Sequence, residues 1–393
     1  MDIFEKCREY TRARDLQAAG LYAWFLPIQN SEGTEAVFDG NRVLMLGSNN
    51  YLGLTTDPRV RQAAIDATNE FGTSCTGSRF LNGTLELHHE LENRLAKFVG
   101  KEQALVFSTG YQVNLGVISC LAGKGDTIVT DKEDHASIID GAMLAHGELR
   151  RFGHHNIDHF ERILKSIDED SGAMVVVDGL YSVSGDLSPL PEMTPICKKY
   201  GARLMVDDAH GMGVMARGRG TAAHFGVTDD VDLIMGTFSK SFASLGGFIA
   251  GDEDIIHYIK HNARSMMFSA AMPASNVAAA LAALDIIENE PERVDRLWAV
   301  ADRMRNGLKQ LGFDTGGSVS PVIPIIIGAE KLALIAWKKL FEAGVYTNVF
   351  LPPAVPVGKS LLRTSYMATH TDEQIDRALN IMEDVGRELG LNA

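Results

Sequence analysis

The stretch VDLIMGTFSKS, at residues 231–241, joins a short apolar run to a polar segment that contains Lys240. The run at 231–235 has the length and composition of a buried strand, and small and hydroxyl-bearing residues follow it. A lysine at the end of such a strand can form a Schiff base with an aldehyde, while the neighbouring hydroxyls hold a phosphate group. Most lysines after strands are solvated surface residues, so this stretch alone favours that simpler interpretation.

A second stretch, RLMVDDAHG at residues 203–211, again ends an apolar run in a carboxylate, Asp207, and places His210 three residues later. The ring of pyridoxal phosphate withdraws electrons only while its nitrogen is protonated, and a partly buried carboxylate beside that nitrogen favours the protonated form. Asp207 fits this role, and His210 could donate a hydrogen bond to the 3-oxygen of the ring. Each residue alone is more often an ordinary loop, cap or core residue. The two stretches in this order together predict a pyridoxal-phosphate site.

Short apolar runs alternate with longer helical patterns through most of the chain. Runs that are apolar throughout and are joined by helix-length connections are typical of a mainly parallel sheet with helices on both faces. Ligands bind at the carboxyl ends of the strands in such sheets, and Asp207 and Lys240 both fall there. We therefore expect an α/β fold with strands at 104–107, 127–130, 173–178, 203–207, 231–235 and 247–251.

The pattern changes after Pro273. Long helices are expected at 274–288 and 291–311, followed by a strand at 322–327, a helix at 331–343, a strand at 361–365 and a final helix from 372. This order predicts an α+β C-terminal domain. The first residues indicate a helix and a strand-turn-strand that pack as an arm. We expect an N-terminal arm at 1–45, a large cofactor-binding domain at 46–275 and a small α+β domain at 276–393.

The composition fits a soluble enzyme, because 393 residues that are 45% hydrophobic and 22% charged can bury a large core. The formal net charge of −14 argues against a nucleic-acid-binding protein, which normally carries a basic face. The four cysteines are scattered, without a Cys-x-x-Cys pair or zinc-like spacing. We therefore expect reduced thiols, a cytoplasmic location and no metal site. No apolar stretch is long enough to span a membrane, although a lipid product would leave a peripheral membrane contact open.

Three further segments contain residues that fit the same cofactor site. FSTGYQ, at 107–112, follows an expected strand and opens a helix, so its backbone N–H groups and hydroxyls could hold a phosphate. An ordinary N-cap explains this segment about equally well. His135 could stack on a flat ring or be a solvated loop histidine. Ser182 could bond to the cofactor or the substrate, although the nearby Gly185-Asp186 favours a simple turn.

Together these residues resemble the α-oxoamine synthases, the fold-type I pyridoxal-phosphate enzymes that condense an amino acid with an acyl thioester and release carbon dioxide. The resemblance extends from about residue 20 to the C-terminus, and such an ordered series of motifs is highly specific for the superfamily. The family usually has glutamate at the position of Asp208, a change that leaves the ring partner untouched. The matching motifs are SNNYLG at 48–53, GSR at 77–79, Gly83-Thr84, His88, Leu91-Glu92, Gly110-Tyr111, His135, DDAHG at 207–211, GTFSK at 236–240 and Leu362-Arg363.

The resemblance implies a role for each matching residue. Lys240 would be the Schiff-base lysine and, once free, the base that removes the α-proton. Asp207 would pair with the ring nitrogen, and His135 would stack on the ring. His210 and Ser182 would bind the 3-oxygen of the ring, and Gly110, Tyr111 and Thr237 would bind the phosphate. In a homodimer, Ser269 would reach the phosphate bound by the partner subunit. Asn50 and Arg363 would hold the substrate carboxylate.

Within the family, GSRFLNGT at 77–84, DHASIIDG at 134–141 and residues 236–247 are most similar to the bacterial serine palmitoyltransferases. That resemblance implies the decarboxylating condensation of L-serine with palmitoyl-coenzyme A to 3-ketosphinganine, the first step of sphingolipid synthesis. Glycine C-acetyltransferase (2-amino-3-ketobutyrate CoA ligase) and 8-amino-7-oxononanoate synthase stay open as alternatives. The latter tends to carry Gly-His where this chain has Ser78-Arg79. Apolar residues at Met143, Leu144, Phe350, Leu351 and Met367 could line an acyl channel, although such residues usually form plain core.

Two functions of other classes have less support. A catalytically silent regulatory subunit of this family typically lacks the Schiff-base lysine, whereas Lys240 is present here together with Asp207, His135 and Arg363. A nucleotide-binding dehydrogenase would need a Gly-x-Gly-x-x-Gly motif after an early strand with an acidic residue downstream, and the sequence has none.

Overall fold

The computed structural model describes residues 2–392, which form two compact units. The large unit is Asn49–Trp298, and the small unit combines the residues up to Ser48 with the segment from Ala299. The expected division after residues 45 and 275 stays a prediction, because a compact unit need not be a domain that folds on its own. No helix within residues 2–392 is long and apolar enough to cross a membrane.

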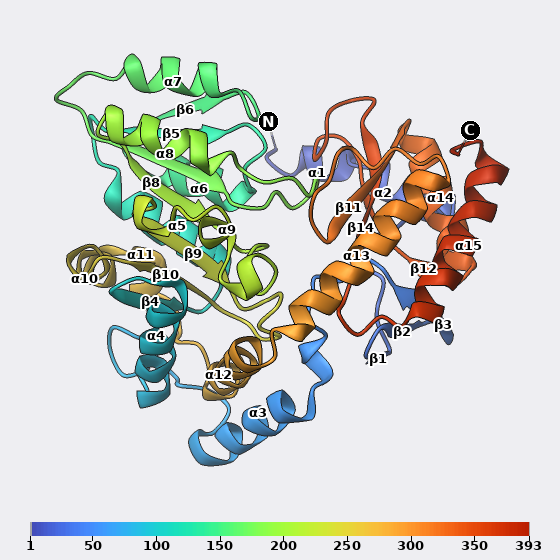
Figure 1. The fold of residues 1–393 in the computed structure, drawn as a ribbon, viewed down its shortest axis with the longest axis horizontal. Coiled ribbons are helices and arrows are strands. Elements are labelled where there is room, and N and C mark those ends of the chain that lie inside the picture. The colour runs from blue at the N-terminus through green and yellow to red at the C-terminus, as the bar shows by residue number, and fades with distance from the viewer. Residues whose placement is uncertain (1, 393) are drawn as a thin grey trace. The chain divides into compact units, whose positions relative to one another are not determined.

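A seven-stranded sheet forms the centre of the large unit (Figure 1). Its order is β4-β10-β9-β8-β7-β5-β6, and only β10 runs antiparallel to its neighbours, which confirms the prediction of a mainly parallel α/β sheet. The strands are β4 (Gln103–Phe107), β5 (Thr127–Asp131), β6 (Glu148–Phe152), β7 (Ala173–Asp178), β8 (Arg203–Asp207), β9 (Leu233–Thr237) and β10 (Gly247–Gly251). Strand β6 was not expected from the sequence, because its residues, ELRRF, do not form an apolar run. Only the last of them, Phe152, is buried in this edge strand.

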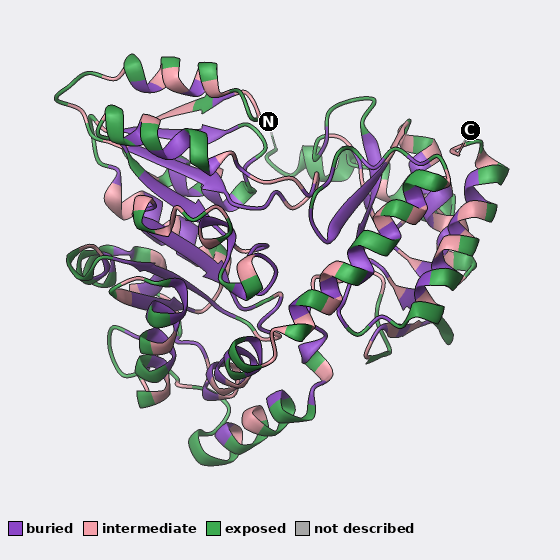
Figure 2. Cartoon of the chain, in the orientation of Figure 1, coloured by how far each residue is buried: buried purple, intermediate pink, exposed green. Residues whose placement is uncertain are grey.

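Helices cover the sheet and bury its strands, as the purple strands of Figure 2 show. Every residue of β5, β9 and β10 is buried, and β9 and β10 carry no polar side chain apart from Thr237 at the end of β9. The helices are α3 (Pro58–Phe71), α4 (Glu86–Val99), α5 (Gly110–Leu121), α6 (Ala136–Leu144), α7 (Ile157–Lys165), α8 (Leu190–Lys199), α9 (Thr221–His224), α10 (Glu253–Asn262), α11 (Arg264–Met267) and α12 (Ala274–Asn289). Helix α13 (Glu292–Gln310) follows α12 in the chain.

The register of the strands aligns their polar ends along one edge of the sheet. Asp178 pairs with Asp207, so β7 and β8 end at the same level. Gly247, the first residue of β10, lies opposite both Thr237 and Phe107, the last residues of β9 and β4. The chain therefore leaves the sheet at this carboxyl edge several times, and the residues that follow each strand are brought close together.

The small unit contains two further sheets. One has the order β1-β2-β3-β12, in which β12 pairs in parallel with β3, so the N-terminal segment and the C-terminal segment share a sheet. The other has the order β11-β14-β13. The strands are β1 (Asn30–Glu32), β2 (Glu35–Phe38), β3 (Asn41–Met45), β11 (Val322–Gly328), β12 (Val345–Tyr346), β13 (Asn348–Phe350) and β14 (Ser360–Ser365), and the helices are α1 (Glu5–Glu9), α2 (Arg12–Ala18), α14 (Glu330–Glu342) and α15 (Asp372–Leu389).

Candidate active site

A cavity of about 270 Å³ lies in the large unit, at the residues that follow the carboxyl ends of β4, β5, β8 and β9. Polar groups that line such a recess can act on a ligand in a lower dielectric than bulk water, where their charges have larger effects. Seven of the residues singled out in the sequence line this cavity: Gly110, Tyr111, His135, Asp207, His210, Thr237 and Lys240. Their individual roles stay predictions.

Asp207 is buried at the end of β8, and two donors fix its carboxylate. Its Oδ1 accepts a hydrogen bond from the backbone N–H of Ala209 at 3.0 Å, and its Oδ2 accepts one from Nδ2 of Asn114 at 2.6 Å. Donors to both oxygens stabilise the charged form of a carboxylate and hold it in one orientation. Asp207 is thus held in one orientation at the wall of the cavity.

Asn114 extends this arrangement to His135. The second N–H of Asn114 donates to Oγ of Ser137 at 2.8 Å, and Oγ of Ser137 lies 2.7 Å from Nδ1 of His135. The backbone N–H of Ser137 also donates to that Nδ1, so the neutral ring carries its proton on Nε2. Desolvation by the surrounding protein lowers the pKa of His135, although Asp207 acts in the opposite direction. The imidazole at this wall is therefore neutral near pH 7.

The N-terminus of α5 forms another wall of the cavity. Thr109 caps the helix by accepting from the backbone N–H of Gln112, and Gly110 is its first residue. A Cβ at Gly110 would lie 2.7 Å from Oγ1 of Thr237, so only glycine allows the helix to approach the end of β9 this closely. Thr237 and Ser239 add hydroxyls that contact each other at 3.0 Å. Free helix N–H groups with adjacent hydroxyls make a suitable site for a phosphate.

Two loops hold the other side of the cavity. His210 is buried, and its Nδ1 lies 2.7 Å from the hydroxyl of Tyr51. When Tyr51 donates to Nδ1, the proton of the neutral ring resides on Nε2 and can be donated elsewhere. Lys240 lies three residues after the end of β9, and the next residue, Ser241, is packed against Gly213. A Cβ at Gly213 would lie 2.2 Å from that serine, and its φ of +77° also requires glycine.

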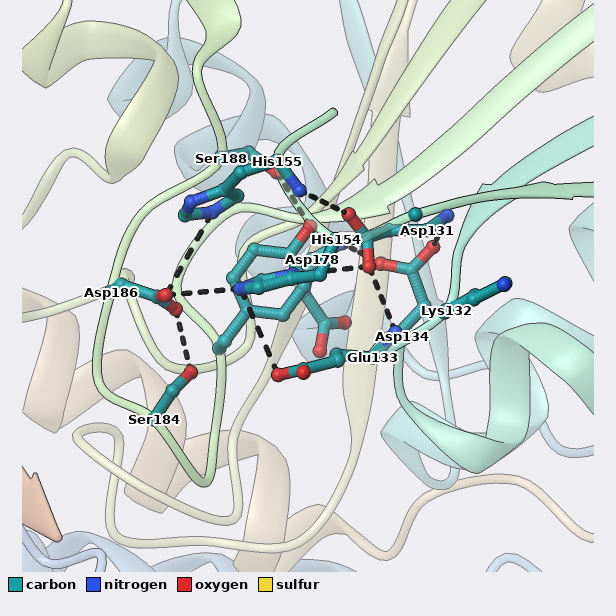
Figure 3. Close-up of polar contacts among 12 residues, drawn as sticks. Asp131, Lys132, Glu133, Asp134, His154, His155, Asp178, Ser184, Asp186 and Ser188 are labelled. Atoms are coloured by element: carbon teal, nitrogen blue, oxygen red, sulfur yellow. Dashed lines mark hydrogen bonds and ion pairs between the residues drawn. The ribbon is translucent and has the colours of Figure 1, made fainter. Parts of the chain in front are cut away.

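A network of carboxylates and imidazoles supports the wall that carries His135 (Figure 3). The carboxylate of Asp134 accepts from the backbone N–H groups of Asp131 and Asp178 at 2.6 and 2.8 Å, which ties the ends of β5 and β7 together. Burial raises the pKa of Asp134 and that of Asp178 well above the ordinary range. These residues place His135, the neighbour of Asp134, at the carboxyl edge.

His154 supplies the positive charge of this network. Its Nδ1 lies 3.1 Å from Oδ1 of Asp131, and its Nε2 lies 3.0 Å from Oδ2 of Asp186. Burial alone would lower the pKa of His154, but the hydrogen bonds to both carboxylates outweigh burial and raise it to about 10. His154, His155 and Asp186 are residue types that bind metals and lie close together. Because both ring nitrogens of His154 face carboxylates, we interpret this cluster as a protonated histidine held between two carboxylates and not as a metal site.

Four of the singled-out residues do not line the cavity. Ser182 lies half-buried in the turn after β7, and Ser269 accepts a hydrogen bond from Nε2 of Gln112 at 3.1 Å. Asn50 is buried and donates to Oγ1 of Thr55 at 2.8 Å. Arg363 is buried on β14 of the small unit, where it lines a different cavity.

The sequence reasoning missed three residues that shape the cavity. Asn114 and Ser137 were not singled out, and Tyr51 appeared only inside a motif without a role. Asn114 did carry a signal, because it is a polar residue in the otherwise apolar helix segment VNLGV. A buried amide requires hydrogen-bond partners, so a polar residue in an apolar helix indicates that other polar groups lie next to it in the fold.

Comparison with known proteins agrees with this geometry. The family described as aminotransferase class I and II matches residues 41–382. A serine palmitoyltransferase from Sphingobacterium spiritivorum is 50% identical over 387 residues, which cover 98% of this chain and 97% of the relative. An 8-amino-7-oxononanoate synthase from Symbiobacterium thermophilum is 41% identical over 378 residues, which cover 96% of each chain.

A high-resolution structure of SPT with the PLP internal aldimine has a TM-score of 0.97 to this chain at 36% sequence identity. The likeness covers 100% of both chains. It confirms the prediction of the fold-type I architecture, and the matches together confirm the family resemblance read from the motifs.

Proposed function

Because this chain belongs to the aminotransferase class I and II family, we propose that it is a pyridoxal-phosphate-dependent acyltransferase of the serine palmitoyltransferase type. It condenses L-serine with the acyl group of palmitoyl-coenzyme A and releases carbon dioxide, which gives 3-ketosphinganine. The observation that carries the proposal is the cavity in which Lys240, Asp207 and His135 meet the N-terminus of a helix. The identity of 50% to a serine palmitoyltransferase along nearly the whole chain supports the choice of substrates.

The residues around the cavity fit pyridoxal phosphate. The gap that Gly110 leaves beside Thr237 has helix N–H groups and hydroxyls as donors, which suit a phosphate. Asp207 offers a fixed carboxylate for a ring nitrogen, and Lys240 offers an amine for an aldehyde. His135 offers the flat face of a neutral imidazole. The donor set thus contains one suitable group for each functional group of the cofactor.

When bound, pyridoxal phosphate joins the amine of the substrate through its aldehyde and withdraws electrons from the α-carbon through its protonated ring. Asp207 would pair with the ring nitrogen of the cofactor, and a carboxylate there would favour protonation of that nitrogen. His135 would stack on one face of the ring and would exclude water from that face. Lys240 accepts the α-proton of the substrate at Nζ and later returns a proton to the same carbon, after carbon dioxide has left. The family resemblance assigns the substrate carboxylate to Asn50 and Arg363, and a guanidinium can bind a carboxylate through two parallel hydrogen bonds.

The test is a titration of the purified protein with L-serine, glycine and L-alanine while its visible absorption is recorded. Palmitoyl-coenzyme A is then added, and the release of free thiol is followed. We expect a saturable absorption change and turnover with L-serine, and no turnover in Lys240→Ala. Turnover confined to glycine would reassign the chain to a glycine acyltransferase. Absence of any visible absorption after addition of pyridoxal phosphate would refute the cofactor assignment.

One alternative has a specific observation in its favour. The similarity of 41% to an 8-amino-7-oxononanoate synthase indicates that enzymes with a different amino acid substrate have closely related sequences. The same titration separates the two, because that alternative predicts the larger absorption change and turnover with L-alanine.

The assembly and location of the enzyme are also part of the proposal. We infer a homodimer in which Ser269 serves the phosphate site of the partner subunit, as the family resemblance implies. Light scattering coupled to size-exclusion chromatography measures the mass directly, and a monomer with full activity would contradict the homodimer. The four cysteines are unpaired, which suits a cytoplasmic location with a peripheral membrane contact for release of a lipid product.

A further inference from the structure

The loop at 208–221 of the large unit carries His210, and one buried side chain, that of Asp208, joins its two ends. Asp208 follows β8 directly, is completely buried and does not line the active-site cavity. Its Oδ1 accepts a hydrogen bond from Oγ1 of Thr221, and its Oδ2 accepts one from the backbone N–H of Thr221, each at 2.5 Å. The first and the last residue of the loop are therefore tied together through a single carboxyl group.

Three glycines surround the carboxyl group of Asp208. A Cβ at Gly211 would lie 1.9 Å from its Oδ1, one at Gly179 would lie 2.7 Å from the same oxygen, and one at Gly220 would lie 2.1 Å from its Oδ2. No Cβ can approach an oxygen this closely, so the space fits a side chain of this length and no longer one. Burial raises the pKa of Asp208 to about 7, although the hydrogen bonds from Thr221 lower it. Near neutral pH, the side chain can therefore occupy this space with or without its charge.

The backbone inside the loop has a conformation that must be held by contacts. Ala216 and Arg217 have φ values of +47° and +53°, which are uncommon for residues with a side chain. The N–H of Gly213 donates to the carbonyl oxygen of Gly218 at 2.9 Å, so the middle of the loop turns back on itself. Unusual backbone conformations persist only where the surrounding structure determines them. The tie between the two ends of the loop is such a determinant.

The start of the loop sets the position of His210. The backbone N–H groups of Gly211 and Met212 donate to the carbonyl oxygen of Asp208 at 3.0 and 2.9 Å, which forms the turn that contains His210. The imidazole of His210 lies at the cavity wall, with its Nδ1 2.7 Å from the hydroxyl of Tyr51. A loop with free ends would let this turn move, and the direction of the other ring nitrogen would change with it.

The middle of the loop packs against the segment that carries Lys240. Gly213 and Ser241 are in such close contact that a Cβ at Gly213 would lie 2.2 Å from the Cβ of Ser241. Ser241 is buried, and Lys240 precedes it in the chain. Close-packed interiors transmit small displacements, so a shift of the loop would move the backbone that carries the amine of Lys240.

We propose that Asp208 is a positioning residue that closes the loop at 208–221 through Thr221 and thereby fixes His210 and Lys240 in the active site. The inference rests on the proposed function for the roles of His210 and Lys240. It goes beyond that function because Asp208 itself does not line the cavity. It also states what Asp208 provides, namely the length of its side chain and its hydrogen bonds to Thr221, and not a charge.

The experiment compares two substitutions that separate shape from charge. Asp208→Asn keeps the length and both contacts with Thr221, because its oxygen can accept from the N–H and its amide can donate to the hydroxyl. Asp208→Glu keeps the charge but adds a methylene group, for which the three glycines leave no room. With L-serine and palmitoyl-coenzyme A, we expect Asp208→Asn to retain kcat within about threefold and Asp208→Glu to lower it at least about tenfold. KM for L-serine should change less than about twofold in both.

A second set of variants covers the case in which Asp208→Glu does not fold. Thr221→Val removes the hydroxyl that donates to Oδ1 of Asp208 and keeps the size of the side chain. We expect it to lower kcat about three- to tenfold, and Thr221→Ser, which keeps the hydroxyl, to restore kcat. Thr68→Val is the matched control, because Oγ1 of Thr68 donates to the carbonyl oxygen of Ala64 within α3, and kcat should not change.

Two readouts report on the loop without any turnover. Hydrogen exchange of the backbone amides at 211–221 is measured in the protein without cofactor, and nitrogen NMR of labelled histidine reports on the ring of His210. We expect faster exchange throughout the loop and an altered His210 signal in Asp208→Glu and Thr221→Val, and neither change in Asp208→Asn. A thermal melt identifies any variant that has not folded.

The outcomes separate the inference from the proposed function. Wild-type kcat, exchange and His210 signal in folded Asp208→Glu and Thr221→Val enzymes would overturn the inference while the proposed function stands. A large loss of kcat in Asp208→Asn with an unchanged loop would also overturn it, because the charge and not the closure of the loop would then matter. A wild-type protein that turns over no amino acid would refute the proposed function, and the exchange and NMR measurements alone would then support or reject the role of Asp208 in the loop.

Discussion

Replacement of Asn114 by leucine tests how the carboxylate and the imidazole of the active site are held. Leucine has nearly the same size and shape as asparagine but cannot donate a hydrogen bond. It removes the 2.6 Å bond to Oδ2 of Asp207 and the 2.8 Å bond to Oγ of Ser137. Because a carboxylate only accepts hydrogen bonds, the amide nitrogen of Asn114 must face Asp207, and the substitution therefore removes a real donor.

The size of the effect follows from the two contacts. A hydrogen bond to a charged group contributes about 1.5–3 kcal/mol, and one between neutral groups about 1 kcal/mol. If the bond to Asp207 counts fully in the transition state, Asn114→Leu lowers kcat about 10- to 100-fold. Ser137→Ala keeps the bond to Asp207 and removes the contacts that Oγ of Ser137 makes with Asn114 and His135, so it should cost about fivefold or less.

The assays include readouts that a general loss of stability would not change. The visible absorption of the bound cofactor is recorded as a function of pH, and nitrogen NMR of labelled histidine reports the protonated ring nitrogen of His135. We expect Asn114→Leu to shift the pH profile and both variants to alter the His135 signal. A thermal melt checks that each variant is folded. Wild-type kcat, pH profile and His135 signal in a folded Asn114→Leu enzyme would refute the reasoning.

Three further predictions follow from the same site. His154 gains protons on folding, so its stabilisation of up to about 4 kcal/mol is complete below pH 6.5 and is lost as the pH rises towards about 10; chemical denaturation at several pH values should show this decline, and His154→Gln should flatten it. Gly110→Ala places a Cβ 2.7 Å from Oγ1 of Thr237 and should weaken cofactor binding at least about tenfold in an equilibrium titration, whereas an unchanged affinity would exclude a phosphate there. Asp207→Asn should lower kcat at least about tenfold without a loss of folding, and near-normal turnover would remove Asp207 from its proposed role.

The strands and the residues at their ends were predictable because their signals are local. A buried parallel strand contains an apolar run, and the polar residue that ends the run marks the carboxyl end of the strand, as Asp207 does in β8. Strand β6 does not follow this rule, because it lies at the edge of the sheet and only its last residue, Phe152, is buried. The motifs around Lys240 and Asp207 indicated the cofactor, since the chemistry requires those residue types in that order.

The partners of the site residues were not predictable in the same way. Asn114 meets Asp207 across 93 residues and Ser137 across 23, and nothing in a linear sequence shows that two side chains so far apart share a hydrogen bond. The order of the strands, with β10 antiparallel between β4 and β9, depends on the packing of the whole sheet.

The amino-acid sequence by itself determined the fold class, the family and the reactive groups, because apolar runs and short motifs are local patterns. Only the tertiary structure decided that Asn114 links Asp207 to the Ser137–His135 pair and that His154 lies between Asp131 and Asp186. Hydrogen bonds, charge pairs and cavities depend on distances between side chains in space, and those distances exist only once the chain has folded.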